Sequence, residues 1–327
     1  MLKIIYFGSP DISAKLLHAL ILEPQFQVCA VISNPDRPIG RSNQPRPTPV
    51  ASQAIESNIP LFCYTSLKGE QQNQVLTDLK QFDADVGVVF AYGSIIPESI
   101  FSLPKLGSVN LHGSLLPLLR GASPIHSAIL GGFTTTGWTL QKLAKRMDAG
   151  DILATTKIDI EENEIADELL ERMLPLGIDL MIDSLKRIQE ILTTATAQDE
   201  SKATYCSKLH VDDSWIDWQG SSIEIHNKIR ALNSAVLARS INLSTEKQFL
   251  FHRSEIPPDG LVNETDFELK PGQIIIRKFN RKKRLLVRTG SGFLEIIELQ
   301  LAGRKRMNAN DCANGGNIED GIRFGKK

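Results

Sequence analysis

The chain has 327 residues, with 37 Lys and Arg, 38 Asp and Glu, a hydrophobic fraction of 42% and a charged fraction of 23%. This composition is ordinary for a globular protein, and the length is sufficient for two domains. The four cysteines lie far apart without a CxxC pair, which argues against a structural zinc site and is typical of the reducing cytoplasm. The start is not typical of a signal peptide, and no run of about 18 apolar residues occurs, so no membrane association is expected.

The charge is unevenly distributed along the chain. Residues 1–205 carry 17 basic and 23 acidic side chains (net −6), whereas residues 206–327 carry 20 and 15 (net +5). Ten basic side chains lie within 277–306, where only Glu295 and Glu298 are acidic. Such a cluster is either a solubilising face or, on a second domain, a surface for a polyanionic substrate.

The first half of the chain alternates apolar strands with helices. We predict strands at 2–7, 28–33, 85–90 and 108–111, and extended segments at 139–142 and 151–160. We predict helices at 11–22, 51–57, 67–82 and 165–192. Strands that are apolar on both faces and alternate with helices indicate an α/β fold with a doubly wound, mostly parallel sheet. In such sheets, ligands bind beyond the carboxyl ends of the strands.

A dinucleotide site is poorly supported at the first of these strand ends. After the first strand the chain continues Gly8-Ser9-Pro10-Asp11, which lacks the second and third glycines of the GxGxxG fingerprint. Proline also removes a backbone N–H that would bind phosphate. A nicotinamide-dependent enzyme is therefore not the favoured interpretation.

The second half predicts a smaller β domain. Residues 191–210 are polar and are expected to form a linker between a first domain at 1–190 and a second at 211–327. A helix is predicted at 221–232, followed by strands at 238–243, 247–253, 272–278, 284–288 and 293–299. Five short strands with one helix indicate a small β-barrel or half-barrel.

A polar cluster is expected where the strand at 108–111 ends. Asn110 and His112 are two residues apart, so on an extended segment their side chains point to the same side. Asp148 lies 36 residues after His112 in a later turn. An amide donor, a histidine that donates or shuttles a proton and a carboxylate that orients it suit an acyl transfer in which charge develops on a carbonyl oxygen. The structural alternative is an Asn that satisfies backbone groups beside a buried His.

Three neighbouring features favour the functional interpretation. A tight turn at 114–117 follows His112 directly, and a helix begins near 120–125, where its first N–H groups would face the same region. Asp148 itself belongs to a turn, Asp148-Ala149-Gly150-Asp151, which precedes a new extended segment.

Seven motifs carry a resemblance to a known family. They are residues 7–11, 34–41, 91–97, 110–117, 120–125, 147–151 and 302–307. Together they make the chain similar to the folate-dependent formyltransferases, and the 34–41 loop and the C-terminal domain resemble the methionyl-tRNA formyltransferases within that group. The resemblance implies a Rossmann-like catalytic domain followed by an OB-like tRNA-binding domain. It also implies 10-formyltetrahydrofolate as formyl donor, initiator methionyl-tRNA as acceptor, no metal, and a monomeric cytoplasmic enzyme.

The resemblance also implies a set of site residues. The catalytic residues would be Asn110, His112 and Asp148. The folate-binding residues would be Phe90, Ala91, Tyr92, Gly93, Ile95, Ser114, Leu115, Leu116 and Pro117. The tRNA-binding residues would be Arg37, Arg41, Arg46, Lys282, Lys283, Arg284, Arg304 and Lys305. For Tyr92, a loop residue that caps the core is an equal alternative to direct contact with the folate.

The chain departs from the family pattern at a few places on the acceptor side. Leu118-Leu119 stands where Arg-Trp is common, and Trp138 replaces a small β-branched residue. The usual Pro-Trp-Pro turn is absent at 233–235. Two alternatives therefore stay open: a formyltransferase that acts on a nucleotide-linked amino sugar, and a non-catalytic tRNA-binding relative.

Overall fold

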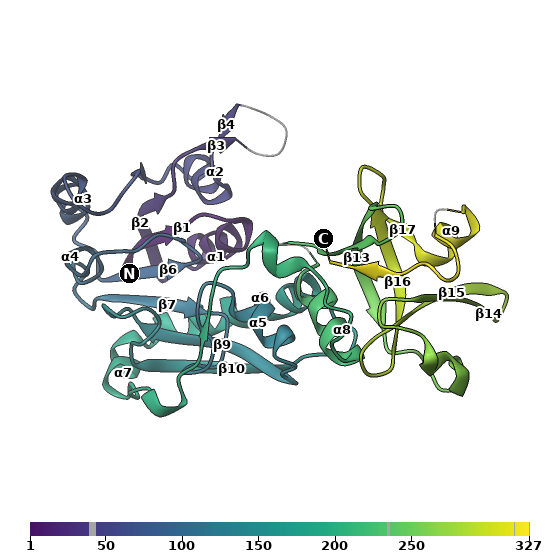
Figure 1. The fold of residues 1–327 in the computed structure, drawn as a ribbon. Helices are drawn as coiled ribbons and strands as arrows, with labels where there is room; N and C mark the ends of the chain where they lie inside the picture. Colours follow the sequence, from purple (N-terminus) through teal and green to yellow (C-terminus); the bar gives the residue numbers. More distant parts are fainter. Residues whose placement is uncertain (39–43, 234–235, 317, 327) are drawn as a thin grey trace. The chain divides into compact units, whose positions relative to one another are not determined.

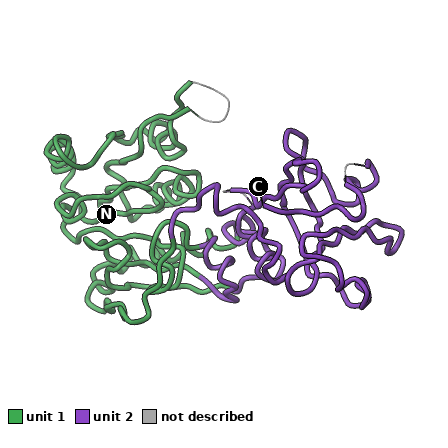
Figure 2. The backbone as a smooth tube through the Cα atoms, in the orientation of Figure 1, with its two compact units in different colours: residues 1–124, 137–158, 172–206 green, residues 125–136, 159–171, 207–327 purple. Residues whose placement is uncertain are grey.

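The computed structural model describes residues 1–38, 44–233, 236–316 and 318–326 of the chain. These residues form two compact units, which Figure 2 shows in different colours. Unit 1 comprises residues 1–124, 137–158 and 172–206, and unit 2 comprises residues 125–136, 159–171 and 207–327. Unit 2 therefore includes two short segments, 125–136 and 159–171, that precede its main part in the sequence.

The main sheet of unit 1 is mostly parallel (Figure 1). Its strands are β1 (Leu2–Gly8), β2 (Phe26–Ser33), β5 (Leu61–Cys63), β6 (Val86–Phe90), β7 (Ser108–His112), β9 (Thr135–Lys142) and β10 (Ile152–Asp159). They lie in the order β10-β9-β7-β6-β1-β2-β5, and β1, β2, β5, β6 and β7 pair in parallel. The carboxyl ends of these parallel strands consequently meet at one edge of the sheet.

Helices cover both faces of this sheet because its strands are apolar on both sides. Ile5 and Phe7 of β1 pack in one core cluster with Val75 and Leu79 of α3 (Gln71–Lys80). The intervening Tyr6 points to the other face, where its hydroxyl donates to the carbonyl oxygen of Ser13 in α1 (Asp11–Leu22) at 2.7 Å. Burial raises the pKa of Tyr6 above its ordinary value. The alternation of side chains along one strand thus explains the doubly wound arrangement.

The pairing of β7 with β9 brings together the side chains that matter for the site. These strands are antiparallel, with Asn110 opposite Gln141 and His112 opposite Thr139. Side chains of directly opposed residues lie on the same face of the sheet. The register therefore sets two polar pairs side by side at the edge where β6 and β7 end.

Unit 2 contains an antiparallel sheet around an aromatic core. Its strand order is β14-β15-β16-β13-β12-β18, formed by Ile274–Phe279, Lys282–Arg288, Phe293–Leu301, Gln248–Glu255, Ala238–Asn242 and Phe324–Gly325, while β17 (Met307–Asn308) pairs with β16. Trp218 stacks on Phe324 with ring centroids 5.8 Å apart. The helix α8 (Ser222–Ala231) begins with a reciprocal capping box between Ser221 and Glu224, as expected for a stable helix start.

The ends of the unit 2 sheet meet without a continuous ladder. An isolated bridge joins Gln273 to Arg323, and the Ile274 N–H donates to the Ile322 carbonyl oxygen at 2.8 Å. The predicted α/β domain with a smaller β domain is confirmed, but among the described residues the β domain is a curled sheet and not a closed barrel.

The other helices are α2 (Pro49–Glu56), α4 (Glu98–Phe101), α5 (Pro124–Leu130), α6 (Ala166–Lys186), α7 (Ile188–Thr193) and α9 (Ala309–Asn314).

Within the described part of the chain, none of the helices is both long and apolar enough to cross a membrane.

One departure from the family pattern is explained by local packing. Trp138, on β9, is 2% exposed and stands edge-on to Phe90 with ring centroids 5.5 Å apart. Its Nε1 donates to the carbonyl oxygen of Met173 in α6 at 2.7 Å. The indole fits against α6 because Gly177 has no side chain there.

Replacing Gly177 with Ala should destabilise the protein, although Ala is the better helix former. A Cβ at this position would lie 2.8 Å from Nε1 and 2.9 Å from Cε2 of the buried Trp138. The gain in helix propensity is about 1 kcal/mol, whereas overpacking costs about 1–3 kcal/mol. Urea unfolding should therefore show a lower free energy, and Trp138→Val in the same protein should cost less than it does alone. An unchanged stability of Gly177→Ala would contradict this packing account.

Candidate active site

The three predicted catalytic residues lie together in unit 1. The Nδ1 atom of His112 is 3.6 Å from Oδ2 of Asp148, and Nδ2 of Asn110 is 3.5 Å from Oδ1 of the same carboxylate. The side chains of His112 and Asp148 are 6% and 12% exposed, so the pair is largely withdrawn from water. The two-residue spacing on β7 and the later turn thus converge as the sequence predicts.

The Asp148 carboxylate is held by two stronger donors than Asn110. The Gly121 N–H donates to Oδ2 at 2.9 Å, and Nε2 of Gln141 donates to Oδ1 at 2.9 Å. Asp148 itself has a φ of +52°, in the left-handed region that costs free energy for a residue other than glycine. These contacts fix the orientation of the carboxylate in its turn.

Gly121 can approach Asp148 because it lacks a side chain. Its φ is +122°, and a Cβ there would lie 2.1 Å from the carbonyl oxygen of Cys206. That close approach comes from the short parallel pairing of β8 (Arg120–Gly121) with β11 (Tyr205–Cys206). A larger residue at 121 would separate the two strands and withdraw the N–H from Asp148.

The imidazole of His112 lies between two acceptors. Nε2 is 2.9 Å from the carbonyl oxygen of Leu119, and Nδ1 faces the Asp148 carboxylate. The Leu119 carbonyl oxygen can only accept a hydrogen bond, so Nε2 is the donor in that contact. Leu119 has a φ of +57°, which turns its carbonyl toward the ring. Donation from Nε2 to a substrate oxygen requires this contact to open.

A second layer of polar side chains lies behind this cluster and has no signal in the sequence. Arg120 is fully buried and forms an ion pair with Glu200 at 2.8 Å. The same guanidinium donates to Oε1 of Gln198, whose Nε2 donates to the backbone of the Asp148 turn. The hydrogen bond from Arg120 lowers the pKa of Glu200. Gln198 and Glu200 lie in the segment expected to be a linker, which has no periodicity or motif that signals their role.

The first predicted folate loop follows β6 and is anchored by two buried aromatic side chains. Phe90 and Tyr92 are 2% and 3% exposed, and Tyr92 stands edge-on to Phe7 in the core. Burial raises the pKa of Tyr92 to about 12. Ala91 and Gly93 have φ values of +50° and +76°. The side chains of Phe90 and Tyr92 therefore hold the loop against the core. The side chain of Ile95, in contrast, is 62% exposed.

The second predicted folate segment, residues 114–117, is tied to β9. Oγ1 of Thr139 donates to the Ser114 carbonyl oxygen at 2.7 Å and accepts from the Leu116 N–H at 3.0 Å. Ser114 and Leu116 are buried, while Leu115 and Pro117 are partly exposed, and the Leu116–Pro117 bond is cis. Thr139 stands opposite His112 in the β7–β9 pair. The residue that holds this turn is therefore the cross-strand neighbour of His112.

Two of the three predicted tRNA-binding residues of unit 1, Arg37 and Arg46, lie on a pair of short antiparallel strands. Arg37 and Arg46 are exposed and pair with each other across β3 (Arg37–Pro38) and β4 (Pro45–Arg46). Arg41 lies outside the described residues. The strand pair β3–β4 thus presents two cations, Arg37 and Arg46, to solvent.

The predicted tRNA-binding residues of unit 2 differ in their surroundings. Lys282 and Lys283 on β15 are exposed, as are Arg304 and Lys305. Arg284 instead forms a bidentate ion pair with Glu295, whose side chain is 3% exposed. The hydrogen bond with Glu295 raises the pKa of Arg284. Arg284 is therefore bound within the β domain, whereas Lys282 and Lys283 are exposed, with Nζ of Lys283 donating to the Ala313 carbonyl oxygen at 3.3 Å.

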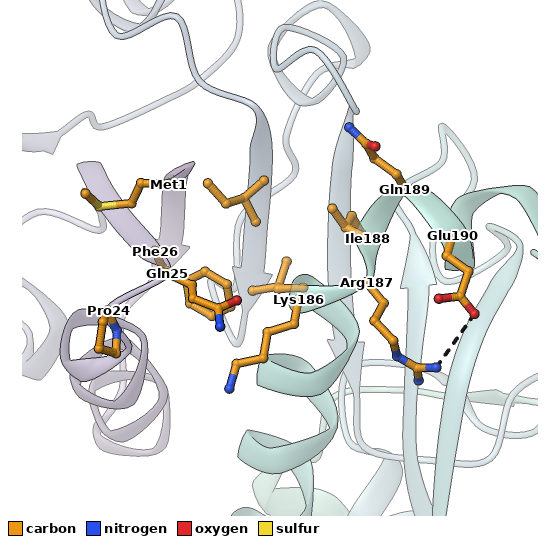
Figure 3. A pocket seen from close by; sticks show the side chains of 11 residues that line it. Met1, Pro24, Gln25, Phe26, Lys186, Arg187, Ile188, Gln189 and Glu190 are labelled. Carbon is orange, nitrogen blue, oxygen red and sulfur yellow. Dashed lines mark ion pairs between the residues drawn. The ribbon is translucent and has the colours of Figure 1, made fainter.

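A pocket of about 690 Å³ in unit 1 lies at the opposite edge of the sheet, where β1 and β2 begin (Figure 3). It contains none of the predicted site residues. Its two cationic side chains already pair with carboxylates, Lys186 with Glu23 at 2.7 Å and Arg187 with Glu190 at 3.7 Å. Both of these side-chain charges are therefore compensated within the lining or next to it. Across the residues that the structure describes, no group of three His, Cys, Asp or Glu side chains is arranged to hold a metal ion.

Comparison with known proteins matches both halves of the chain to one family. Residues 2–185 match the formyl transferase family, and residues 208–317 match the formyl transferase C-terminal domain. The first match includes Asn110, His112 and Asp148.

Two relatives cover nearly the whole chain. A methionyl-tRNA formyltransferase from Leptospira interrogans is 42% identical over 325 residues, which are 99% of this chain and 100% of the relative. A methionyl-tRNA formyltransferase from Staphylococcus aureus is 36% identical and covers 100% of this chain and 99% of its own length. A solved N-formyltransferase from Helicobacter canadensis, in complex with folinic acid and dTDP-3-aminofucose, covers 90% of this chain and 99% of its own. Its TM-score of 0.61 at 19% identity shows a shared fold.

The Arg284–Glu295 ion pair should stabilise the folded protein. Arg284→Ala leaves the buried Glu295 carboxylate without its cation, which should lower the free energy of unfolding by about 3 kcal/mol. Lys282→Ala, on the same strand but exposed, should change it by less than about 0.5 kcal/mol. Glu295→Leu should recover stability in the Arg284→Ala protein. Equal unfolding midpoints in urea for Arg284→Ala and Lys282→Ala would disprove a structural role for Arg284.

Proposed function

This chain belongs to the formyl transferase family, and on that premise we propose that it transfers the formyl group of 10-formyltetrahydrofolate to the free amino group of initiator methionyl-tRNA. One observation carries the proposal: relatives named methionyl-tRNA formyltransferase match 99–100% of the chain at 42% and 36% identity. The product, N-formylmethionyl-tRNA, serves translation initiation.

The proposed chemistry assigns one role to each member of the cluster. The α-amine attacks the formyl carbon, the bond from that carbon to N10 breaks, and a proton passes from the amine to N10. Asn110 donates its side-chain amide to the formyl oxygen as negative charge develops there, a contribution of about 3–4 kcal/mol for one such donor. His112 donates to the same oxygen once Nε2 leaves the Leu119 carbonyl. Asp148 holds the charged imidazole and passes the proton through water.

We assign the folate to the loops that border this cluster. Residues 90–95 and 114–117 lie at the ends of β6 and β7, and both are fixed by contacts to buried groups. In this assignment the pterin meets backbone groups and the partly exposed side chains of the loops. The buried rings of Phe90 and Tyr92 shape the loop, and Ile95, Leu115 and Pro117 offer apolar surface.

We assign the tRNA to both units. Arg37, Arg41 and Arg46 belong to a proline-rich loop, and a stiffened basic loop suits contact with the acceptor stem. In unit 2, the exposed Lys282, Lys283, Arg304 and Lys305 provide phosphate contacts. Residues 1–190 are the proposed catalytic domain and 211–327 the proposed tRNA-binding domain.

Acceptor choice tests the proposal directly. The protein should be incubated with 10-formyltetrahydrofolate and, in separate reactions, methionyl-tRNA or a nucleotide-linked amino sugar. We expect formylated methionyl-tRNA and no formylated sugar. Formylation of the sugar alone would favour the sugar-modifying alternative. Binding of tRNA without formylation of either acceptor would indicate the non-catalytic alternative.

The two exposed lysines of β15 should contribute to the salt dependence of tRNA binding. Each phosphate contact contributes about 0.7–0.9 to the slope of log K against log salt concentration, so Lys282→Ala with Lys283→Ala should reduce the slope by about 1.5. Folate binding should not change. Lys68→Ala with Lys80→Ala, two exposed lysines of unit 1, is the matched control. An unchanged slope in the β15 variant would mean that these lysines only face solvent.

A further inference from the structure

We propose that Gln198 is a positioning residue for formyl transfer, because its side-chain amide fixes the turn that carries Asp148. This inference rests on the proposed function and adds a residue that the family motifs do not include. Gln198 contacts neither His112 nor Asn110 in the structure, so its effect acts through Asp148.

The contacts of Gln198 leave one orientation for its amide. Nε and an Nη atom of Arg120 donate to Oε1 of Gln198 at 3.1 and 2.8 Å. A guanidinium can only donate, so the oxygen of Gln198 must face it. The Nε2 atom of Gln198 then donates to the carbonyl oxygens of Asp148 and Gly150 at 2.9 and 2.7 Å. Both N–H groups of the amide are consequently used on the two sides of the Asp148 turn.

The side-chain amide of Gln198 also contacts Gln141, which is one of the donors to the Asp148 carboxylate. Nε2 of Gln198 lies 3.4 Å from Oε1 of Gln141, whose own Nε2 donates to Oδ1 of Asp148. Gln198 thus constrains the backbone of Asp148 directly and the partner of its carboxylate indirectly. A polar network whose members are all satisfied is rigid. This rigidity keeps Asp148 in its left-handed conformation with the carboxylate toward His112.

Backbone hydrogen bonds, which do not involve the side chain of Gln198, attach the segment around Gln198 to the rest of unit 1. Thr196 and Ile152 exchange backbone hydrogen bonds at 2.8 and 2.9 Å, and the Arg120 N–H donates to the Thr204 carbonyl oxygen at 2.9 Å. The side chain of Gln198 can therefore be changed while the path of the backbone is maintained. Its loss releases the Asp148 turn, and a displacement of about 1 Å in a catalytic group costs up to about a hundredfold in rate.

Two substitutions at this position separate positioning from simple support of Arg120. Gln198→Met keeps the length of the side chain and removes all polar contacts. Gln198→Glu keeps an acceptor for Arg120 but removes both N–H donors and sets a carboxylate against two carbonyl oxygens. A residue that only supports Arg120 tolerates Glu, whereas a residue that positions the Asp148 turn does not. Gln189→Met, on the exposed face of α7, is the matched control.

The experiment measures kcat and KM for formyl transfer, with the melting midpoint of each variant. We expect Gln198→Met and Gln198→Glu both to lower kcat by tenfold to a hundredfold, with KM for 10-formyltetrahydrofolate unchanged and each variant still folded at the assay temperature. Gln189→Met should match the parent. A kcat close to the parental value in Gln198→Glu would overturn the proposal.

A double-mutant cycle shows whether Gln198 acts through Asp148. In an Asp148→Asn protein, Gln198→Met should lower the single-turnover rate by less than threefold, because the group that it positions is already disabled. An equal loss in both backgrounds would overturn the positioning role. The cycle uses whichever acceptor the parental protein formylates, so failure of the tRNA assignment and failure of the Gln198 assignment give different results.

Discussion

The candidate site depends on the fixed geometry of one carboxylate. Asp148 stands in a left-handed conformation at a turn, and donors from three separate segments hold its two oxygens: Gly121, Gln141 and Asn110. Each donor needs a particular feature of the fold, namely the close approach of β8 and β11 for Gly121 and the β7–β9 register for the other two. The sheet edge, the short strand pair and the turn are thus all required to set Asp148 beside His112.

Local pattern predicts the fold and the centre of the site, but not the layer that supports it. Apolar strands and helical spacing predict the main elements of both units, and the two-residue spacing of Asn110 and His112 predicts their common side. Gln141 becomes visible only through the β7–β9 register, and Gln198 only through the path of a segment without periodicity. The two-residue strands β8 and β11 are equally hidden, because such short segments carry no repeating pattern.

Charge in unit 2 has two different uses that the sequence does not distinguish. Adjacent residues of β15 include exposed lysines and Arg284, which is bound to Glu295 inside the sheet. Glu295 is one of the two acidic residues in the basic stretch, and the cross-strand pairing explains why it is there. A count of positive residues therefore overstates the surface that is available to a polyanion. In unit 1, packing explains a departure from the family pattern: the indole of Trp138 fits against α6 because Gly177 has no side chain there.

We propose that the Asp148 carboxylate enables formyl transfer by its position beside His112. The direct measurement is the single-turnover rate of formyl transfer to methionyl-tRNA by Asp148→Asn at saturating 10-formyltetrahydrofolate. The amide matches the carboxylate in size but cannot support a charged imidazole, so we expect a rate at least about a hundredfold below that of the parent. Donor affinity and melting midpoint should stay parental. A near-parental rate in a stably folded Asp148→Asn protein would contradict the account.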